Sequence, residues 1–587
     1  MIKNPQIWMF YVLCWHCGYG HDIRLRLGDR ITIEMKRGFL FLLCILGGCD
    51  SGLQQIDRNV DRLMEERSLS IGSHAPGVSL QKDSVFTESI EDTNPSTINP
   101  SNDELVFVSA KELNAREIAN TLQEADGFLS ENNTLLTLDD ALSWGSLHAK
   151  EFEFAQYDYL STTLSLLSEL HVWGPRFSNK ISNTLDGDST GGLYETSFDV
   201  VNDYQVSQNL YNGGTVSASA LTSFAKSVHG ASTSSSTSDT ALGLDFEIPL
   251  LSGSGAVARE SLIQAKRNLV YGARTYERFR REFYREIAGD YLSLVVQKQS
   301  LHNAQMGVES LQHLANRQAA LYGSGRTRLY DSVDAENQAL AAVASLSQSW
   351  ERYRLALDRF KIRIGWPIES DIDIVPAMIG VVPPEVNVSD AVVQALLFRL
   401  DLQNEYNQLG DAKRGVANAV NSLLPDATFT VGIGTDSDPN KPLRFSGDDI
   451  DFVAGLTFSV PLDKETERIA VRQRQISLEK AKRNYRESRD GVAVSVRSAL
   501  RSIEVFQFTL ELQERNVEIA KLGLDSINAD PDRVSVLDQT RAISDLQSAK
   551  DSRDSAKRDV ELSIIDYLLQ AGQLRINQDG TLVLPTE

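Results

Sequence analysis

FEIPL, at residues 246–250, recurs as FSVPL at residues 458–462, which lie 212 residues further along the chain. Each copy closes a stretch of alternating apolar residues, the pattern that predicts a β-strand. Two more matches follow at offsets of 216 and 207 residues, and such drifting offsets indicate small insertions between two copies of one duplicated unit. These matches are AKRN at 265–268 and 481–484, and Arg326 with Asp331 against Arg533 with Asp538.

A long helical hairpin is predicted after each strand motif, because apolar residues there repeat every seven positions. A period of 3.5 residues makes neighbouring helices supercoil about a shared seam. The helix predicted over 255–321 would be on the order of 100 Å long at about 1.5 Å per residue. The seam positions are Ile287, Leu294, Leu301, Val308 and Ala315 in the first copy, and Val496, Ile503, Leu510, Val517 and Leu524 in the second.

The strands are few and need partners. Candidates are a stretch within 196–225 and the stretches 238–250, 427–434 and 450–462, about two in each half. An isolated two-stranded hairpin is marginal in water. Copies of the chain arranged around an axis would close these strands into one barrel without free edges, as a membrane requires of spanning β-structure.

The N-terminus indicates a lipoprotein. All four cysteines lie in the first 49 residues, and Met35–Arg37 followed by the apolar stretch 38–46 has the order of a secretory signal. Leu46–Cys49 (LGGC) matches a bacterial lipobox, with a chance match as the alternative, so we expect diacylglycerol and acyl chains on Cys49. The predicted divisions are an over-extended start at 1–34, a signal peptide at 35–48, an acidic flexible tether at 49–130, a first repeat at 131–375, a second at 376–575 and a tail at 576–587.

Composition argues against several classes of protein. The 587 residues carry a formal net charge of −22, which disfavours nucleic-acid binding. Beyond residue 50 no run of about 18 apolar residues predicts a membrane helix. The histidines lack metal-binding spacing and no phosphate-binding loop appears. We therefore expect no catalytic residues, no metal and no cofactor other than the lipid on Cys49.

The duplicated pattern over roughly 134–572 resembles the TolC-like outer-membrane efflux proteins. The resemblance rests on short motifs that occur in family order and twice over. They are LTLDDAL at 136–142, the strand-to-helix turns PLLSGSG at 249–255 and PL at 461–462, AL at 395–396 before DL at 401–402, LLPD at 423–426, and the tip GSGR at 323–326 leading to Asp331 and DA at 334–335. One departure is Trp173–Pro175 (WGP), which stands where a Leu-Leu-Pro entry to a strand is expected.

The resemblance implies a mainly α fold with β: two tandem repeats of coiled-coil hairpins and membrane strands. Three protomers, each giving four strands, would form a 12-stranded β-barrel continued by a 12-helix α-barrel. It also implies an outer-membrane protein that extends into the periplasm, bound to a periplasmic adaptor (membrane fusion) protein and an inner-membrane pump. The implied function is a passive export conduit of a tripartite efflux pump or a type I secretion system.

Family motifs place the functional residues at the hairpin tips. Asp331, Asp334 and Asp538 are the pore-constriction candidates, because three-fold symmetry would turn each into a ring of carboxylates that attracts cations. The alternative is that they cap helices. The candidates for a tip latch or adaptor contact are Gly323, Gly325, Arg326, Arg328, Arg533 and Arg541. The alternative for the arginines is that they are ordinary surface charges. The alternative for the glycines is that they simply break the helix.

Two other functions stay open at this point. A lipid-anchored periplasmic coiled-coil adaptor or scaffold would share the lipobox and the long hairpins. It would flank a single hairpin with lipoyl-like segments, whereas this chain has two equivalent hairpins, each preceded by strands. A hydrolase would need a constellation of catalytic residues that the sequence does not offer.

Overall fold

The computed structural model describes residues 24–26, 32–34, 49–70, 72, 134–190, 193–229, 236–438, 441, 444–529 and 534–583. The chain forms two compact units, Met1–Leu63 with Gly77–Glu91 and Met64–Pro76 with Asp92–Glu587. In the first unit, β1 (Arg24–Arg26) pairs antiparallel with β2 (Thr32–Glu34). The predicted signal peptide and most of the predicted tether lie outside the described residues.

One part of the predicted tether is a helix instead. Helix α3 spans Cys49–Ser70. Its apolar residues Ile56, Val60, Leu63 and Met64 are spaced by threes and fours, which is the helical period. The tether was predicted from the acidic composition of the whole segment, and that composition does not reflect this local pattern.

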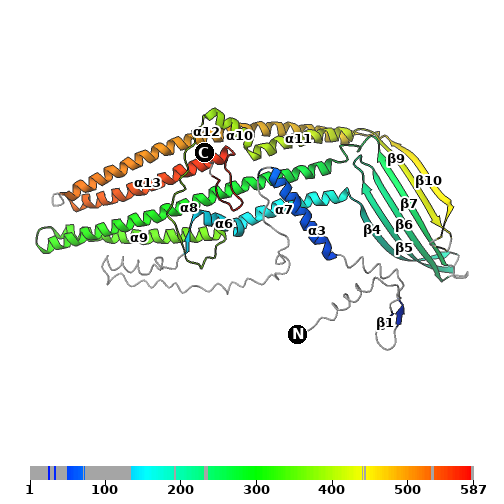
Figure 1. Cartoon of the computed structure of the whole chain (residues 1–587), viewed down its shortest axis with the longest axis horizontal. Coiled ribbons are helices and arrows are strands. Elements are labelled where there is room, and N and C mark those ends of the chain that lie inside the picture. The colour runs from blue at the N-terminus through cyan, green and yellow to red at the C-terminus, as the bar shows by residue number, and fades with distance from the viewer. Residues whose placement is uncertain are drawn as a thin grey trace. The chain divides into compact units, whose positions relative to one another are not determined.

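The second unit contains two repeats with the same order of helices, as the sequence predicts. In the first repeat the helices are α6 (Leu138–His148), α7 (Lys150–Val172), α8 (Glu260–Gly323) and α9 (Leu329–Ile364). In the second they are α10 (Val388–Phe398), α11 (Leu400–Asn421), α12 (Glu465–Ala529) and α13 (Val536–Gln570). Each short helix pair precedes the strands, and each long hairpin follows them (Figure 1).

A six-stranded antiparallel sheet lies at one end of these helices (Figure 1). The resemblance implied four strands from each protomer, and the structure corrects this number because the first repeat supplies four strands by itself. The stretch predicted within 196–225 is two strands, and the polar strand before it was missed. In chain order the strands are β4 (Arg176–Thr190), β5 (Leu193–Asn209), β6 (Thr215–His229), β7 (Ser236–Pro249), β9 (Asp426–Ser437) and β10 (Phe445–Ser459), and their order in the sheet is β10-β9-β7-β6-β5-β4.

Local capping starts the first repeat. The Thr137 side chain accepts a hydrogen bond from the Asp140 amide, and the Asp140 carboxylate accepts one from the Thr137 amide, which completes a capping box. The preceding strand β3 (Thr134–Leu136) pairs in parallel with β8 (Ile372–Ile374), which leads from the first repeat into the second. This backbone pairing ties the beginning of the first repeat to its end.

The core follows the predicted seam of α8. Its seam residues Ile287, Leu294, Leu301 and Val308 are buried, and α8 packs against α7, α9 and α13. A buried ion cluster fixes the C-terminal residues to the same helix: Arg280 and Arg281 both pair with Glu277, and Arg281 Nη1 donates to the Gly572 carbonyl at 3.2 Å. Pairing of this kind is what allows charges to be buried.

Candidate functional site

A glycine forms the turn at the tip between α8 and α9. Gly325 has a φ of +77°, a conformation that side chains disfavour, and its amide donates to the Tyr322 carbonyl at 2.8 Å. The next amide, of Arg326, donates to the Leu321 carbonyl at 2.9 Å. Gly323 is the last residue of α8 and has no positive φ, so only the second glycine is required by the backbone.

The three candidate aspartates lie at the starts of the returning helices. Asp331 and Asp334 are half-buried in the first turns of α9, and Thr327 Oγ1 donates to Asp331 Oδ2 at 3.2 Å. Asp538 is exposed in the first turn of α13, where Ser535 Oγ donates to Asp538 Oδ2 at 2.6 Å and accepts from its amide at 3.2 Å. Asp331 and Asp538 therefore have local partners typical of helix starts, and these contacts are compatible with a pore ring in an assembly.

The three candidate arginines that the structure describes do not pair with these aspartates within one chain. Arg326, Arg328 and Arg541 are exposed. Among the tip residues that the structure describes, no ion pair joins them to Asp331, Asp334 or Asp538. Arg533 lies outside the described residues. A latch between tips would therefore have to form between copies of the chain or through Arg533.

Apolar packing brings the two tips of one chain together. Val536, at the start of α13, is buried against Ala335 and Ala339 of α9 and Leu311 and Leu314 of α8. Small residues at this contact allow the helices to approach closely. The candidates at the two tips therefore lie at the same end of the helical layer.

The sheet contains a feature that sequence reasoning missed, the confinement of its acidic side chains to one face. Successive strand residues point to opposite faces, so the register assigns every residue to one face. Every register-paired Asp or Glu with a described side chain falls on one face, the acidic face: Asp186, Asp199, Asp203, Asp239, Asp245, Glu247, Asp426, Asp436 and Asp451. The Asp245 carboxylate lies across Gly432 on the adjacent strand, since a Cβ there would come within 2.8 Å of Asp245 Oδ1.

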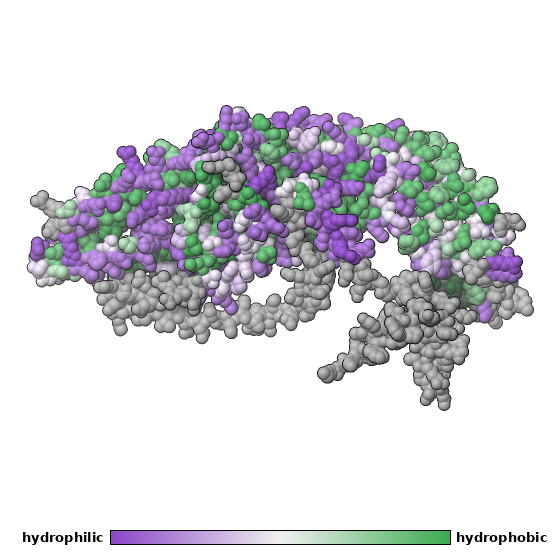
Figure 2. Space-filling model, viewed as in Figure 1, coloured by the Kyte–Doolittle hydropathy of each residue, from purple (hydrophilic) through white to green (hydrophobic). Residues whose placement is uncertain are grey.

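The opposite face, the apolar face, carries large exposed hydrophobic side chains. Phe177 on β4 is 80% exposed and Phe452 on β10 is 81% exposed. Figure 2 shows hydrophobic residues gathered over the part of the sheet formed by β9 and β10, whereas on the helices hydrophobic and hydrophilic residues are interspersed. Further exposed members are Ile181, Leu185, Phe198, Tyr204, Phe224, Leu242, Leu244, Phe429, Ile433, Leu456 and Phe458. A sheet with these two faces is suited to apolar surroundings on one side and water on the other.

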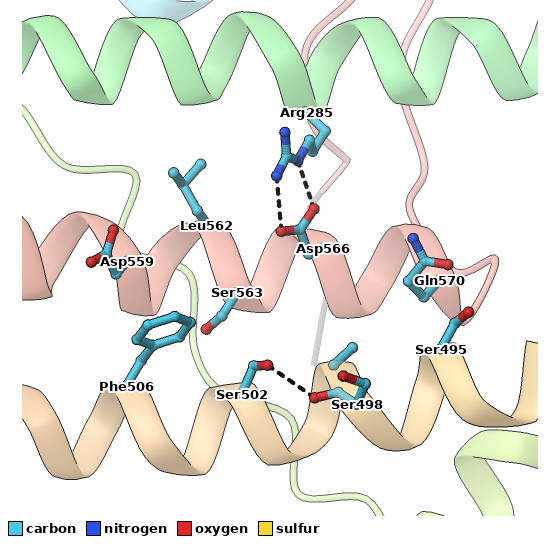
Figure 3. Close-up of a pocket in the computed structure, with 11 residues that line it drawn as sticks. Arg285, Ser495, Ser498, Ser502, Phe506, Asp559, Leu562, Ser563, Asp566 and Gln570 are labelled. Atoms are coloured by element: carbon cyan, nitrogen blue, oxygen red, sulfur yellow. Dashed lines mark hydrogen bonds and ion pairs between the residues drawn. The ribbon is translucent and has the colours of Figure 1, made fainter.

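A polar groove with a volume of about 470 Å³ lies between α8, α12 and α13 (Figure 3). Arg285 of α8 donates to Asp566 of α13 through Nε at 2.6 Å and Nη2 at 3.1 Å. Hydrogen bonding to Asp566 raises the pKa of Arg285. Ser495, Ser498 and Ser502 of α12 line the other wall. The groove holds a salt bridge between the two repeats.

Two observations concern metal sites and membrane-spanning helices, neither of which the sequence predicts. Among the residues that the structure describes, no group of three or more His, Cys, Asp or Glu side chains is arranged to hold a metal ion. Within the same residues, every helix is too short or too polar to cross a bilayer.

Comparison with known proteins identifies the architecture. Residues 391–530, from α10 to the end of α12, match the family model described as outer membrane efflux protein. The outer membrane protein VceC from Vibrio cholerae superposes with a TM-score of 0.58 at 14% identity, covering 74% of this chain and 96% of that one. This chain has the fold of an outer-membrane efflux channel. The predicted resemblance to the TolC-like family is confirmed, and so is the predicted mainly α fold with β.

Other structures agree with this efflux-channel fold. The Campylobacter jejuni CmeC outer membrane channel matches with a TM-score of 0.57 at 14% identity, covering 74% of this chain and 85% of that one. The Neisseria gonorrhoeae MtrE outer membrane channel in its open state matches with a TM-score of 0.55 at 14% identity, covering 74% and 88%. No curated protein matches the sequence of the chain.

Proposed function

We propose that the chain is the outer-membrane channel of a tripartite efflux pump or a type I secretion system, a passive duct rather than an enzyme. The observation that carries this proposal is the two-faced sheet. Exposed hydrophobic side chains cover one face, and the other collects nine carboxylates. Only a wall between lipid and water gives both faces suitable surroundings. A periplasmic adaptor has no use for such a sheet, so this feature disfavours the scaffold alternative.

The open edges of the chain support closure by further copies. Along the hairpin layer the helices follow the order α9–α8–α13–α12, so α9 and α12 are its edges. The sheet ends in β4, which follows α7, and in β10, which leads into α12. The α12–β10 edge of one copy can therefore join the opposite edge of the next, a head-to-tail contact that closes into a ring. Three copies are the number implied by the family resemblance.

The exposed side of α12 provides the apolar seam that such a contact needs. Val494, Val505, Phe508, Leu512, Ile519 and Leu522 are all exposed in the single chain. Their spacings of three, four, seven and eleven residues fit the 3.5-residue period of a coiled coil. A stripe of this length on an edge helix is suited to a helix of the neighbouring copy.

In this assembly the tips would close the duct. We propose that Asp331, Asp334 and Asp538 form rings of carboxylates at the constriction and that Arg326, Arg328, Arg533 and Arg541 latch neighbouring tips. Gly323 and Gly325 would let the adaptor approach, and an inner-membrane pump would supply the free energy of transport. Cys49, the first residue of α3, would carry the lipid that anchors the chain in the outer membrane.

Conductance in a planar bilayer tests the proposal. Full-length protein is expected to give cation-preferring channels, since rings of carboxylates concentrate cations. Asp331→Ala and the double variant Arg326→Ala/Arg328→Ala should raise the single-channel conductance. Arg352→Ala, an exposed arginine of α9 away from the tip, is the matched control and should leave it unchanged. Reconstituted protein that never conducts, even with both tip changes combined, would refute the channel and favour a scaffold.

A further inference from the structure

The first repeat contains a β-hairpin that has no counterpart in the second. Between α7 and α8 the chain forms β4, β5, β6 and β7, whereas between α11 and α12 it forms only β9 and β10. The additional hairpin is β5–β6, with the turn Leu210–Gly214 at the end of the sheet nearest the helices. The FEIPL motif of β7 matches the FSVPL motif of β10, so the extra strands precede a strand end that the two repeats share.

This turn is built into the junction between helices and sheet. Trp173, at the end of α7, stacks on Tyr211 with ring centroids 5.5 Å apart and an interplanar angle of 8°. Gln208 Nε2 donates to the Trp173 carbonyl at 3.4 Å. The WGP motif of residues 173–175, which departs from the Leu-Leu-Pro entry, thus places its tryptophan against the extra turn.

The other side of the turn contacts the segment that leads into α8. The Gly255 amide donates to the Asn212 carbonyl at 2.9 Å. Gly213 has a φ of +95°, and a Cβ there would meet the Gly253 carbonyl and the Ala258 side chain at 2.9 Å. The hairpin is therefore fixed between the two helices that enter and leave the sheet.

The extra strands also continue both faces of the sheet. On β5, Val200 and Tyr204 share the apolar face, while Asp199 and Asp203 share the acidic face. On β6, Phe224 pairs with Val200 on the apolar face. A hairpin packed outside a closed wall would not have lipid on one face and water on the other, so this alternation would not be expected there.

We propose that β5–β6 forms part of the membrane wall, so that each protomer contributes six strands and a trimer closes an eighteen-stranded barrel. This inference rests on the trimeric channel proposed above. Five antiparallel steps separate β4 from β10, so these edge strands run in opposite directions and can pair antiparallel between copies. The two edge strands also have equal lengths of 15 residues.

The added strands set the width of the outer mouth. Barrel diameter grows roughly in proportion to strand number, so eighteen strands give about 1.5 times the diameter of twelve, in the range where large barrels hold an aqueous lumen. A mouth of this width would pass bulky cargo, and the size limit would fall at the helical tips.

Cysteine labelling tests the proposal without changing the fold. The parent is full-length protein with Cys14, Cys17 and Cys44 replaced by Ser, reconstituted in liposomes and treated with a charged, membrane-impermeant maleimide. Gln205→Cys and Ser223→Cys, on the acidic face, should label as fast as Asp436→Cys on β9. Tyr204→Cys and Phe224→Cys, on the apolar face, should label as slowly as Ile433→Cys. Equal labelling of both faces in β5 and β6, with alternation retained in β9, would overturn the proposal.

Direct imaging separates failure of this inference from failure of the proposed function. Electron cryomicroscopy of the detergent-purified protein should show a trimeric barrel of eighteen strands. A conducting trimer with twelve strands would overturn the inference and leave the channel intact, whereas a protein that forms no trimer and no conducting channel would overturn both. Deletion of 191–229 joins β4 to β7 through residues 230–235. Opened-tip channels of that variant should have a smaller size cut-off for neutral polymers than opened-tip channels of the full chain.

Discussion

Helices α8 and α12 occupy equivalent places in the two repeats and have nearly equal lengths of 64 and 65 residues, but their surroundings differ. Twenty-three residues of α8 are buried, and four of α12 are. The same heptad pattern thus produces a central helix in one repeat and an edge helix in the other. The difference draws attention to the exposed apolar stripe of α12 from Val494 to Leu522, for which we have proposed a second copy as the partner.

The largest expected effect comes from placing a charge on each of these two helices. Leu292→Asp in α8 puts a carboxylate at a position with no solvent exposure and should prevent folding, because an unpaired buried charge costs several kcal/mol. Phe508→Asp in α12, at a position 62% exposed, should leave the protomer folded and abolish the trimer. Circular dichroism reports folding, and light scattering after gel filtration reports assembly. A trimeric Phe508→Asp protein would contradict the role assigned to the α12 seam.

The sheet offers a test in which the two repeats should behave alike. Leu244→Arg on β7 and Ile433→Arg on β9 both place a cation on the apolar face, at positions paired with each other in the register. Each is expected to cost about 2–4 kcal/mol of insertion stability if these positions lie near the middle of the bilayer. Refolding into liposomes measures the cost, with Asp245→Arg on the acidic face as the control. A tolerated arginine in only one of the strands would show that the sheet is not a single wall.

Loss of a carboxylate at the break between the two short helices should affect stability differently in the two repeats. Asp401 of the second repeat accepts from Arg399 at 2.7 Å and pairs with Arg278, whereas Glu151 of the first lies 3.8 Å from Arg363. Burial alone would raise the pKa of Asp401, but the Arg399 hydrogen bonds and the Arg278 charge lower it below its ordinary value of 3.8.

Asp401→Asn should therefore destabilise the protein by about 1–2 kcal/mol at neutral pH, toward the lower end of hydrogen bonds to charged groups because Asp401 is partly exposed, and Glu151→Gln by less. Because the pKa of Asp401 is lowered on folding, its contribution is present above pH 3.8 and is lost as the pH falls below that value and through the folded-state pKa. Thermal melting at pH 7 and pH 3 measures both effects. Equal losses for Asp401→Asn and Glu151→Gln would contradict this assignment.

The smallest effect is expected at the first tip. Gly325→Ala should destabilise the turn by about 1 kcal/mol, since an L side chain disfavours its φ of +77°. Gly323→Ala is the control two residues away, with no positive φ and open space around the added methyl group, and should be neutral or slightly stabilising. Hydrogen exchange at the tip amides distinguishes the two variants, and similar protection in both would remove the backbone argument for Gly325.

Sequence reasoning recovered the features that depend on local periodicity. The duplicated FEIPL and FSVPL motifs and the heptad seam through Ile287 and Leu294 predicted elements that the structure contains. Strand β4 was missed because its large apolar residues Phe177, Ile181 and Leu185 recur only every fourth position among polar residues. The width of the sheet was therefore underestimated.

The sequence by itself determined that this protein consists of two similar units with long coiled helices, because the seven-residue hydrophobic repeat is a local property of the sequence. Only the tertiary structure decided that α8 is central and α12 peripheral, that Trp173 stacks on Tyr211, and that nine carboxylates share one face of the sheet. These properties depend on strand register and on which helix packs beside which. Register and packing arise from contacts between residues far apart in the chain, so no local pattern specifies them.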